Sequence, residues 1–178
     1  RLAPSKDPAC AYPPIMGHLS IAAQTSEYQR RLLFASSEAH PLIKTGGLAD
    51  VAGALPAALR DLGYDARLII PAYPRALRQL RELRTLGDLR LPGSGRTARI
   101  IVGRLPHSEL PTYLVDAPDH FAREGNPYTD TSGGDWGDNA DRFMLFCEAI
   151  ARIGMGSQML DWRPELIHCN DWQTGLVP

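Results

Sequence analysis

The chain has 178 residues, of which 44% are hydrophobic and 22% are charged, and its formal net charge at pH 7 is −1. This length and composition are typical of a single folded domain with a sizeable core. A net charge so close to zero argues against nucleic acid or a charged membrane surface as a partner, and no apolar run approaches the length of a membrane span.

The cysteines indicate the cellular compartment of the protein, and the first 31 residues indicate where its folded domain begins. The three cysteines (Cys10, Cys147 and Cys169) are odd in number and widely spaced, which favours a reducing, cytoplasmic compartment without a structural zinc site. Residues 1–31 are broken by prolines and lack the apolar core of a signal peptide. We therefore expect a mobile tail over 1–31, with a remnant of a transit segment as the alternative, and a folded domain over 32–178.

The segment from residue 31 to residue 71 carries the pattern of a βαβ unit. "RLLFASSE" (31–38) is a short apolar run typical of a buried strand, and "ARLIIP" (66–71) is a second one, closed by proline. Between them, "LADVAGALPAALRDL" (48–62) repeats apolar residues at helical spacing, with Gly63 as a C-terminal stop. The order strand, tight loop, helix and strand predicts a right-handed crossover between two parallel strands.

Residues 74–91 show a period of three. Arginines repeat in step with leucines two positions away, which is about 200° around a helix, so we predict a helix with one basic and one apolar face. The basic face is either a groove for a polyanion or a solvated surface. The second reading is favoured because no aromatic residue interleaves with the arginines. The members of the pattern are Arg75, Arg78, Arg81, Arg84, Leu77, Leu80 and Leu83.

The remaining segments extend the α/β pattern. Two strands are predicted over 98–105 and 111–118, and a long glycine-rich loop over 123–138 suggests a functional role. A helix over 139–154 carries one apolar stripe, with Asp138 as its N-cap and Gly154 as its stop.

A last strand is predicted over 164–171. A parallel strand in a doubly wound sheet needs a crossover helix to cover its face, and the six residues after Trp172 are too few to form one. We therefore expect the chain to be the N-terminal piece of a longer protein, with its domain cut before the end.

The stretch "KTGG" is the first candidate site. A Walker A loop has its lysine after the last glycine, and G-x-G-x-x-G does not fit this spacing, so neither motif applies. A loop between a strand and a helix still offers unpaired N–H groups and a positive dipole end to an anion. Gly46 and Gly47 allow close approach to the backbone, and Lys44 supplies a charge. The alternative is a tight turn with a solvated lysine, and the two readings are about equally supported.

The stretch "HCNDWQTGL" is the second candidate site, because ligands of open α/β sheets bind at the carboxyl ends of strands. Asp171 is placed either to bind a sugar hydroxyl or to cap the next helix, and both roles are compatible. His168 is interpreted as a core histidine rather than a catalytic one, and Trp172 as a packing residue rather than a sugar platform.

Five stretches, in this order along the chain, resemble the bacterial glycogen synthase and plant starch synthase family. They are "SSEAHPLIKTGGLADVAGALPAAL", "DARLIIPAYP", "YLVDAPDHFAREGNPY", "DNADRF" and "PELIHCNDWQTGL". The resemblance implies a Rossmann-like sheet as the N-terminal half of a two-domain GT-B architecture. It also implies an enzyme that transfers glucose from ADP-glucose to the non-reducing end of an α-1,4-glucan with retention of configuration, without a metal or other cofactor.

The resemblance further implies roles for individual residues. Lys44, Gly46 and Gly47 would meet the donor diphosphate, in place of a metal ion. Asp50 would set this loop or contact the sugar, and Asp171 would lie beside the transferred glucose and the acceptor.

Two further residues, Asn139 and Tyr128, match positions that line the cleft. Gln173 departs from the family, because many relatives have histidine there; glutamine keeps hydrogen bonding and should spare the Asp171 site. The family's later histidine, its phosphate-binding arginine and lysine and its catalytic glutamate all lie beyond Pro178, so we expect this chain alone to be inactive.

Three rival functions remain open at this stage. One is another GT-B transferase with a different nucleotide-sugar donor, and another is a non-catalytic glucan-binding or regulatory remnant. The third, an NAD-binding domain, is disfavoured by the glycine spacing.

Overall fold

The computed structural model describes residues 30–178, so the tail expected over 1–31 falls almost wholly outside the described residues. Its centre is a six-stranded sheet with the order β3-β4-β5-β2-β1-β6. The strands are β1 (Arg31–Ala35), β2 (Asp65–Pro71), β3 (Arg81–Leu91), β4 (Arg96–Arg104), β5 (Pro111–Asp116) and β6 (Leu166–Cys169).

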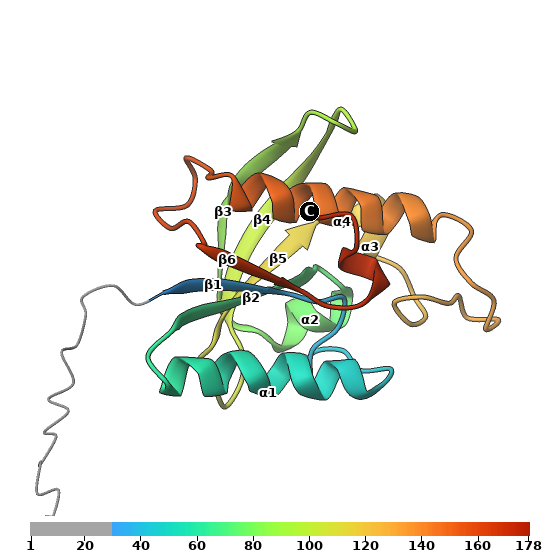
Figure 1. Cartoon of the computed structure of the whole chain (residues 1–178). Helices are drawn as coiled ribbons and strands as arrows, with labels where there is room; N and C mark the ends of the chain where they lie inside the picture. The colour runs from blue at the N-terminus through green and yellow to red at the C-terminus, as the bar shows by residue number, and fades with distance from the viewer. Residues whose placement is uncertain (1–29) are drawn as a thin grey trace, which may run out of the picture.

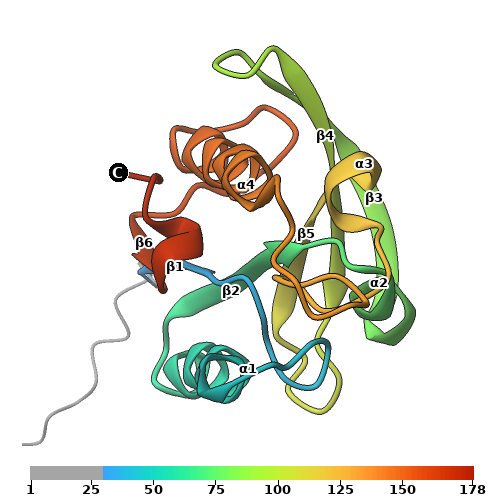
Figure 2. The ribbon, with the colours of Figure 1, turned by 90° about the vertical axis from the view of Figure 1, so that its right-hand side faces the viewer.

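The sheet is mostly parallel and is covered on both faces. Strand β1 pairs in parallel with β2 and β6, and β2 pairs in parallel with β5, whereas β3 and β4 add an antiparallel hairpin. The two long helices lie on opposite sides of the strands (Figures 1 and 2). The helices are α1 (Gly47–Asp61), α2 (Pro74–Gln79), α3 (Pro118–Phe121), α4 (Asn139–Gly154) and the 3₁₀ helix η1 (Trp172–Thr174).

The predicted βαβ unit is confirmed. The apolar run of β1 is buried because sheet neighbours flank it on both sides and helices cover both faces. Helix α1 comes close to the loop after β1: a Cβ added at Gly53 would lie 2.4 Å from the carbonyl oxygen of His40. Gly63 follows α1 with a φ of 90°, the left-handed conformation expected of a helix stop.

The long helix predicted over residues 74–91 is wrong in its second half. Only Pro74–Gln79 is helical, and Arg81–Leu91 forms strand β3 of the hairpin. Near its end the strand alternates exposed and buried residues, with Leu89 and Leu91 in the core. Arginines at a spacing of three fit a helix and an irregular strand equally well. The features that distinguish the strand are the alternation of exposed and buried residues near its end and the "PGSG" turn that follows it.

The termini of α4 differ from the prediction in detail. Asp138 stands at the N-cap position but makes no capping hydrogen bond, because its carboxylate accepts from Arg123 instead. Gly154 is still helical, and Gly156, with a φ of 101°, is the left-handed residue that follows. A Cβ at Gly154 would lie 2.5 Å from Cδ1 of Ile167, so this glycine serves close packing of α4 on β6.

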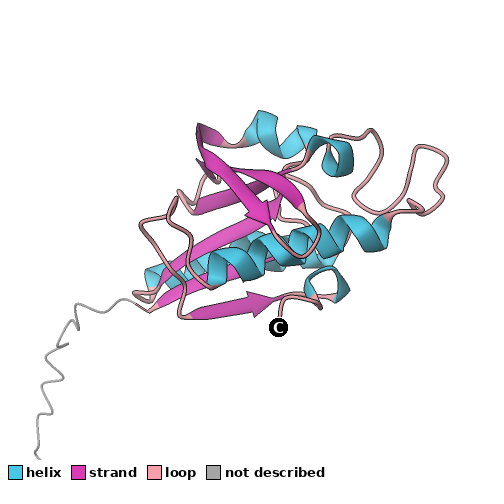
Figure 3. Ribbon diagram, turned by 90° about the horizontal axis from the view of Figure 1, so that it is seen from above, coloured by secondary structure: helices cyan, strands magenta, loops and turns pink. Residues whose placement is uncertain are grey.

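Strand β6 forms one edge of the sheet and runs directly into η1 (Figure 3). Its outward residues, Leu166 and His168, are exposed, and the His168 ring packs on Phe34 with the ring centroids 4.7 Å apart. The expectation of a core histidine is therefore wrong. Because the carboxyl ends of β1 and β6 lie side by side, the loops that follow these two strands meet at one edge of the sheet.

Candidate functional site

The loop between β1 and α1 presents open backbone. Gly46 precedes α1 and Gly47 is its first residue, and no atom lies within 4 Å of a Cβ added at either position. Gly46 has a φ of −149°, which any residue can adopt. A tight turn therefore does not explain these glycines. What they provide is access, since a ligand can approach the first N–H groups of a 15-residue helix without meeting a side chain.

Lys44 lies at the same helix end, held by Asp50. Its Nζ donates to both carboxylate oxygens of Asp50 at 2.7 Å, and about half of each side chain is exposed. An exposed ion pair of this kind is worth about 0–1 kcal/mol, so an anionic ligand competes for the lysine at little cost. The structure therefore brings Lys44, Asp50, Gly46 and Gly47 together.

Glu38 fixes this loop and is a residue that sequence reasoning missed. Only 3% of it is exposed, and its Oε2 accepts hydrogen bonds from the N–H of Thr45 at 2.5 Å and of Gly46 at 3.4 Å. The Thr45 hydroxyl lies 3.0 Å from both carboxylate oxygens. An acid just after a buried strand was the signal available, the same rule that singled out Asp171.

Tyr128 joins the glycine-rich loop to Glu38. Its hydroxyl donates to Oε1 of Glu38 at 3.2 Å and lies 2.7 Å from the hydroxyl of Ser37. Burial raises the pKa of Tyr128 far above its ordinary value, and the charge of Glu38 adds to the rise. The phenol therefore stays protonated and keeps donating at physiological pH.

Asn139 supports this site through hydrogen bonds to the backbone of Tyr128 and to Arg142. Its Nδ2 donates to the carbonyl oxygen of Tyr128 at 2.8 Å, and its Oδ1 accepts from Nη1 of Arg142 at 2.7 Å. Both ends of the amide are thus used inside the protein. Asn139 therefore positions the Tyr128 loop, and its role as a residue that lines the cleft stays a prediction.

Asp171 occupies an unusual backbone conformation at the end of β6. Its φ of 63° and ψ of 179° are typical of glycine, and such a conformation costs about 1–3 kcal/mol for other residues. Neighbouring bonds hold it: Asn170 donates to the carbonyl oxygen of Ala35 at 2.8 Å, and the hydroxyl of Thr174 donates to the carbonyl oxygen of Asn170 at 2.9 Å. The Asp171 carboxylate accepts from the N–H of Trp172 at 2.7 Å, so the predicted capping role is present.

Trp172, next to Asp171, packs near the ring of Tyr128. Its ring centroid lies 5.1 Å from that of Phe143 and 6.2 Å from that of Tyr128, and 56% of Trp172 is still exposed. Gln173 beside it is buried, and its Oε1 has no hydrogen-bond partner in the described part of the chain.

These contacts join two of the predicted sites into one. The glycine loop connects through Glu38 to Tyr128, and Tyr128 connects through its ring to Trp172 and so to Asp171. His168 does not belong to this group. Within residues 30–178, no cluster of three or more His, Cys, Asp or Glu side chains is placed to hold a metal ion, and no helix is long and apolar enough to cross a membrane.

Comparison with known proteins identifies the family to which the chain belongs. Residues 31–178 match the family described as starch synthase catalytic domain, and the chain belongs to that family. The chain is 54% identical over 148 residues to glycogen synthase 2 of Nitrosococcus oceani, and 51% identical over 149 residues to glycogen synthase of Thioalkalivibrio sulfidiphilus. These alignments cover 83% of the chain but only 30% and 31% of the two relatives.

A solved structure supports the same assignment. The catalytic domain of starch synthase IV from Arabidopsis thaliana, bound to ADP and acarbose, matches with a TM-score of 0.66 at 28% identity. The match covers 84% of this chain and 29% of that one. The predicted fold class is confirmed: an α/β, Rossmann-like, mostly parallel sheet of the kind that forms the N-terminal half of a GT-B glycosyltransferase.

Proposed function

We propose that this chain provides the N-terminal half of the active site of a glycogen synthase. The reaction is transfer of glucose from ADP-glucose to the non-reducing 4-hydroxyl of an α-1,4-glucan, with retention of configuration, and the proposed compartment is the cytoplasm. One observation carries the proposal: an exposed lysine and open glycine backbone lie together at the N-terminus of α1.

The donor side uses the glycine loop. The N-terminus of α1 offers unpaired N–H groups and the positive end of the helix dipole to the diphosphate. Lys44 leaves Asp50 and pairs with a phosphate oxygen, so that negative charge developing on the departing ADP is stabilised. Glu38 keeps the loop in place, because its buried carboxylate accepts a hydrogen bond from the N–H of Thr45.

The acceptor side uses the other half of the network. The exposed face of Trp172 is a surface on which a sugar ring stacks, and the Asp171 carboxylate accepts hydrogen bonds from sugar hydroxyls. The strained backbone of Asp171 fits this role, since strain of this kind concentrates at functional sites.

The experiment is a chimera in which residues 31–178 replace the matching 148 residues of the Nitrosococcus oceani glycogen synthase 2. We expect the chimera to transfer glucose from ADP-glucose to glycogen, and the 178-residue chain alone to show no transfer. A folded chimera without activity, or measurable glucan elongation by the chain alone, would contradict the proposal. An Arg90→Gln chimera is the control for substitution at an exposed site far from the loop.

A glucan-binding role without catalysis is the second candidate. It is favoured by the fact that Trp172 and Asp171, the acceptor-side residues, both lie in this chain. Binding of maltoheptaose to the chain that survives Lys44→Ala and is lost in Trp172→Ala, in a chimera that transfers no glucose, would favour this role over the first.

A further inference from the structure

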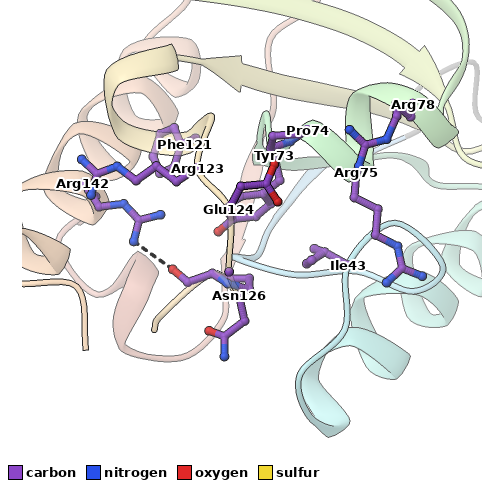
Figure 4. A pocket seen from close by; sticks show the side chains of 12 residues that line it. Ile43, Tyr73, Pro74, Arg75, Arg78, Phe121, Arg123, Glu124, Asn126 and Arg142 are labelled. Atoms are coloured by element: carbon purple, nitrogen blue, oxygen red, sulfur yellow. Dashed lines mark hydrogen bonds between the residues drawn. The ribbon is translucent and has the colours of Figure 1, made fainter. Parts of the chain in front are cut away.

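A cavity of about 210 Å³ lies beside the site but shares none of its proposed ligand-binding residues. Figure 4 shows its walls, which come from the start of α2, from α3 and the loop after it, and from α4. We call it the arginine pocket because four of its lining residues are arginines. They are Arg75, Arg78, Arg123 and Arg142.

Arg142 is a buried cation that forms no salt bridge within residues 30–178, although the Asp138 carboxylate is near enough to interact with its charge. It is 1% exposed and donates to the carbonyl oxygens of His120 at 2.7 Å and Pro127 at 2.9 Å, and to Oδ1 of Asn139 at 2.7 Å. No carboxylate pairs with it within residues 30–178, and its Nη2 has no hydrogen-bond partner there. Buried charges in proteins are normally paired, so this guanidinium is left with unused capacity for an anion.

Tyr73 presents a second unused group to the same pocket. The residue is 5% exposed, and its hydroxyl is buried without a hydrogen-bond partner in the described part of the chain. Figure 4 shows this hydroxyl turned toward the side of the pocket on which Arg142 lies. Buried hydroxyls almost always have a partner, so an orphan hydroxyl that lines a pocket marks the position of a missing acceptor.

The remaining charges leave the pocket positive. Arg123 is neutralised by Asp138, whose carboxylate lies 2.5 Å from its Nη2. Arg75 and Arg78 are exposed and form no ion pair within residues 30–178, and Glu124 is the one acidic residue among the lining residues. With Arg123 paired, Arg75, Arg78 and Arg142 stand against the single negative charge of Glu124, so the lining keeps a surplus of positive charge.

We propose that the arginine pocket binds a small phosphate anion, either inorganic phosphate or the phosphoryl group of a monoester. Guanidinium groups match the geometry of phosphate oxygens, and the Tyr73 hydroxyl donates to the same group. None of residues 44–47 of the glycine loop lines this pocket, although its lining residue Ile43 directly precedes Lys44, and its existence does not depend on the proposed transfer reaction.

The test is calorimetric titration of the 178-residue chain with inorganic phosphate, glucose 1-phosphate and glucose, at one fixed ionic strength because salt screens such contacts. We expect saturable binding of phosphate at one site and no binding of glucose at this pocket. The double variant Arg75→Gln/Arg78→Gln should weaken binding by at least about tenfold, because each lost contact to a charged group is worth about that factor. The control variant Arg90→Gln, which changes an exposed arginine on β3, should bind phosphate as tightly as the unchanged chain does.

Tyr73→Phe keeps the ring and removes only the orphan hydroxyl, so it should fold normally and weaken phosphate binding several-fold. Tighter binding of glucose 1-phosphate than of phosphate identifies a monoester as the ligand, and equal binding identifies the phosphate group alone; both support the site. Absence of saturable binding, or equal binding by the double variant, would overturn the proposal. Loss of binding in Lys44→Ala would also overturn it, because the anion would then lie at the glycine loop.

Discussion

The Tyr128 hydroxyl donates to the Glu38 carboxylate at 3.2 Å, across 90 residues of sequence. Glu38 also holds the N–H of Thr45, so this contact joins the glycine loop to the loop before α4. The two loops come from different strands, and a buried carboxylate is what they share. Its removal tests whether the site is a single unit.

Glu38→Gln keeps the shape of the side chain but removes its charge and one acceptor oxygen. We expect the free energy of unfolding to fall by about 1–3 kcal/mol, because a buried donor on Thr45 or Tyr128 loses its partner. Urea unfolding of the chain measures this change. Asp161→Asn, at an exposed acid without a hydrogen-bond partner in residues 30–178, is the matched control and should change stability by less than about 0.5 kcal/mol.

The glycines at the start of α1 allow a test that separates access from folding. Gly46→Ala meets no atom within 4 Å, so we expect unchanged stability but weaker donor binding in the chimera. Gly53→Ala places a Cβ 2.4 Å from the His40 carbonyl oxygen, so we expect lower stability. Thermal unfolding and the KM for ADP-glucose are the two measurements. Equal donor binding by Gly46→Ala and the unchanged chimera would show that close approach does not matter there.

Substitutions of Asp171 can distinguish the effect of its strained backbone on stability from the effect of its carboxylate on glucose transfer. Because its backbone conformation is typical of glycine, Asp171→Gly should leave the free energy of unfolding unchanged or raise it by up to about 1 kcal/mol, whereas Asp171→Ala should lower it. Both variants should abolish transfer in the chimera, since both lack the carboxylate. An active Asp171→Gly chimera would remove this residue from the proposed mechanism.

Two buried tyrosines, Tyr73 and Tyr113, and the partly buried Tyr128 predict how stability depends on pH. Burial raises the pKa of Tyr73, Tyr113 and Tyr128, so in the folded state each stays protonated at a pH where the unfolded chain has begun to ionise. The contribution of these tyrosines to the free energy of unfolding is fully present below the pKa of a tyrosine in the unfolded chain, which is about 10. It is lost as the pH rises above that value. Unfolding followed from pH 9 to 12 should therefore show stability falling less steeply in Tyr128→Phe than in the unchanged chain. Identical slopes would contradict the burial of this hydroxyl.

Much of the fold follows from local pattern. The apolar runs of β1 and β2, the helical spacing of α1 and α4 and their order fix the parallel core. The period of three over residues 74–91 led to a wrong prediction, because arginines at this spacing are exposed in a helix and in a strand alike. The alternation that ends in Leu89 and Leu91 and the turn that follows it indicate the strand.

The site was predicted only in part. Lys44 and its glycines stand in one motif, and Asp171 lies two residues after β6, so sequence spacing finds them. Glu38 and the arginine pocket depend on segments far apart in the chain, which only the folded sheet brings together.

The most direct test of the proposed function is the structure of the chimera with ADP bound. We expect Nζ of Lys44 to have left Asp50 and to lie about 3 Å from a diphosphate oxygen, with the N–H group of Gly47 facing the same group. A structure in which ADP is bound, Lys44 still pairs with Asp50 and the diphosphate lies away from the glycine loop would contradict the account.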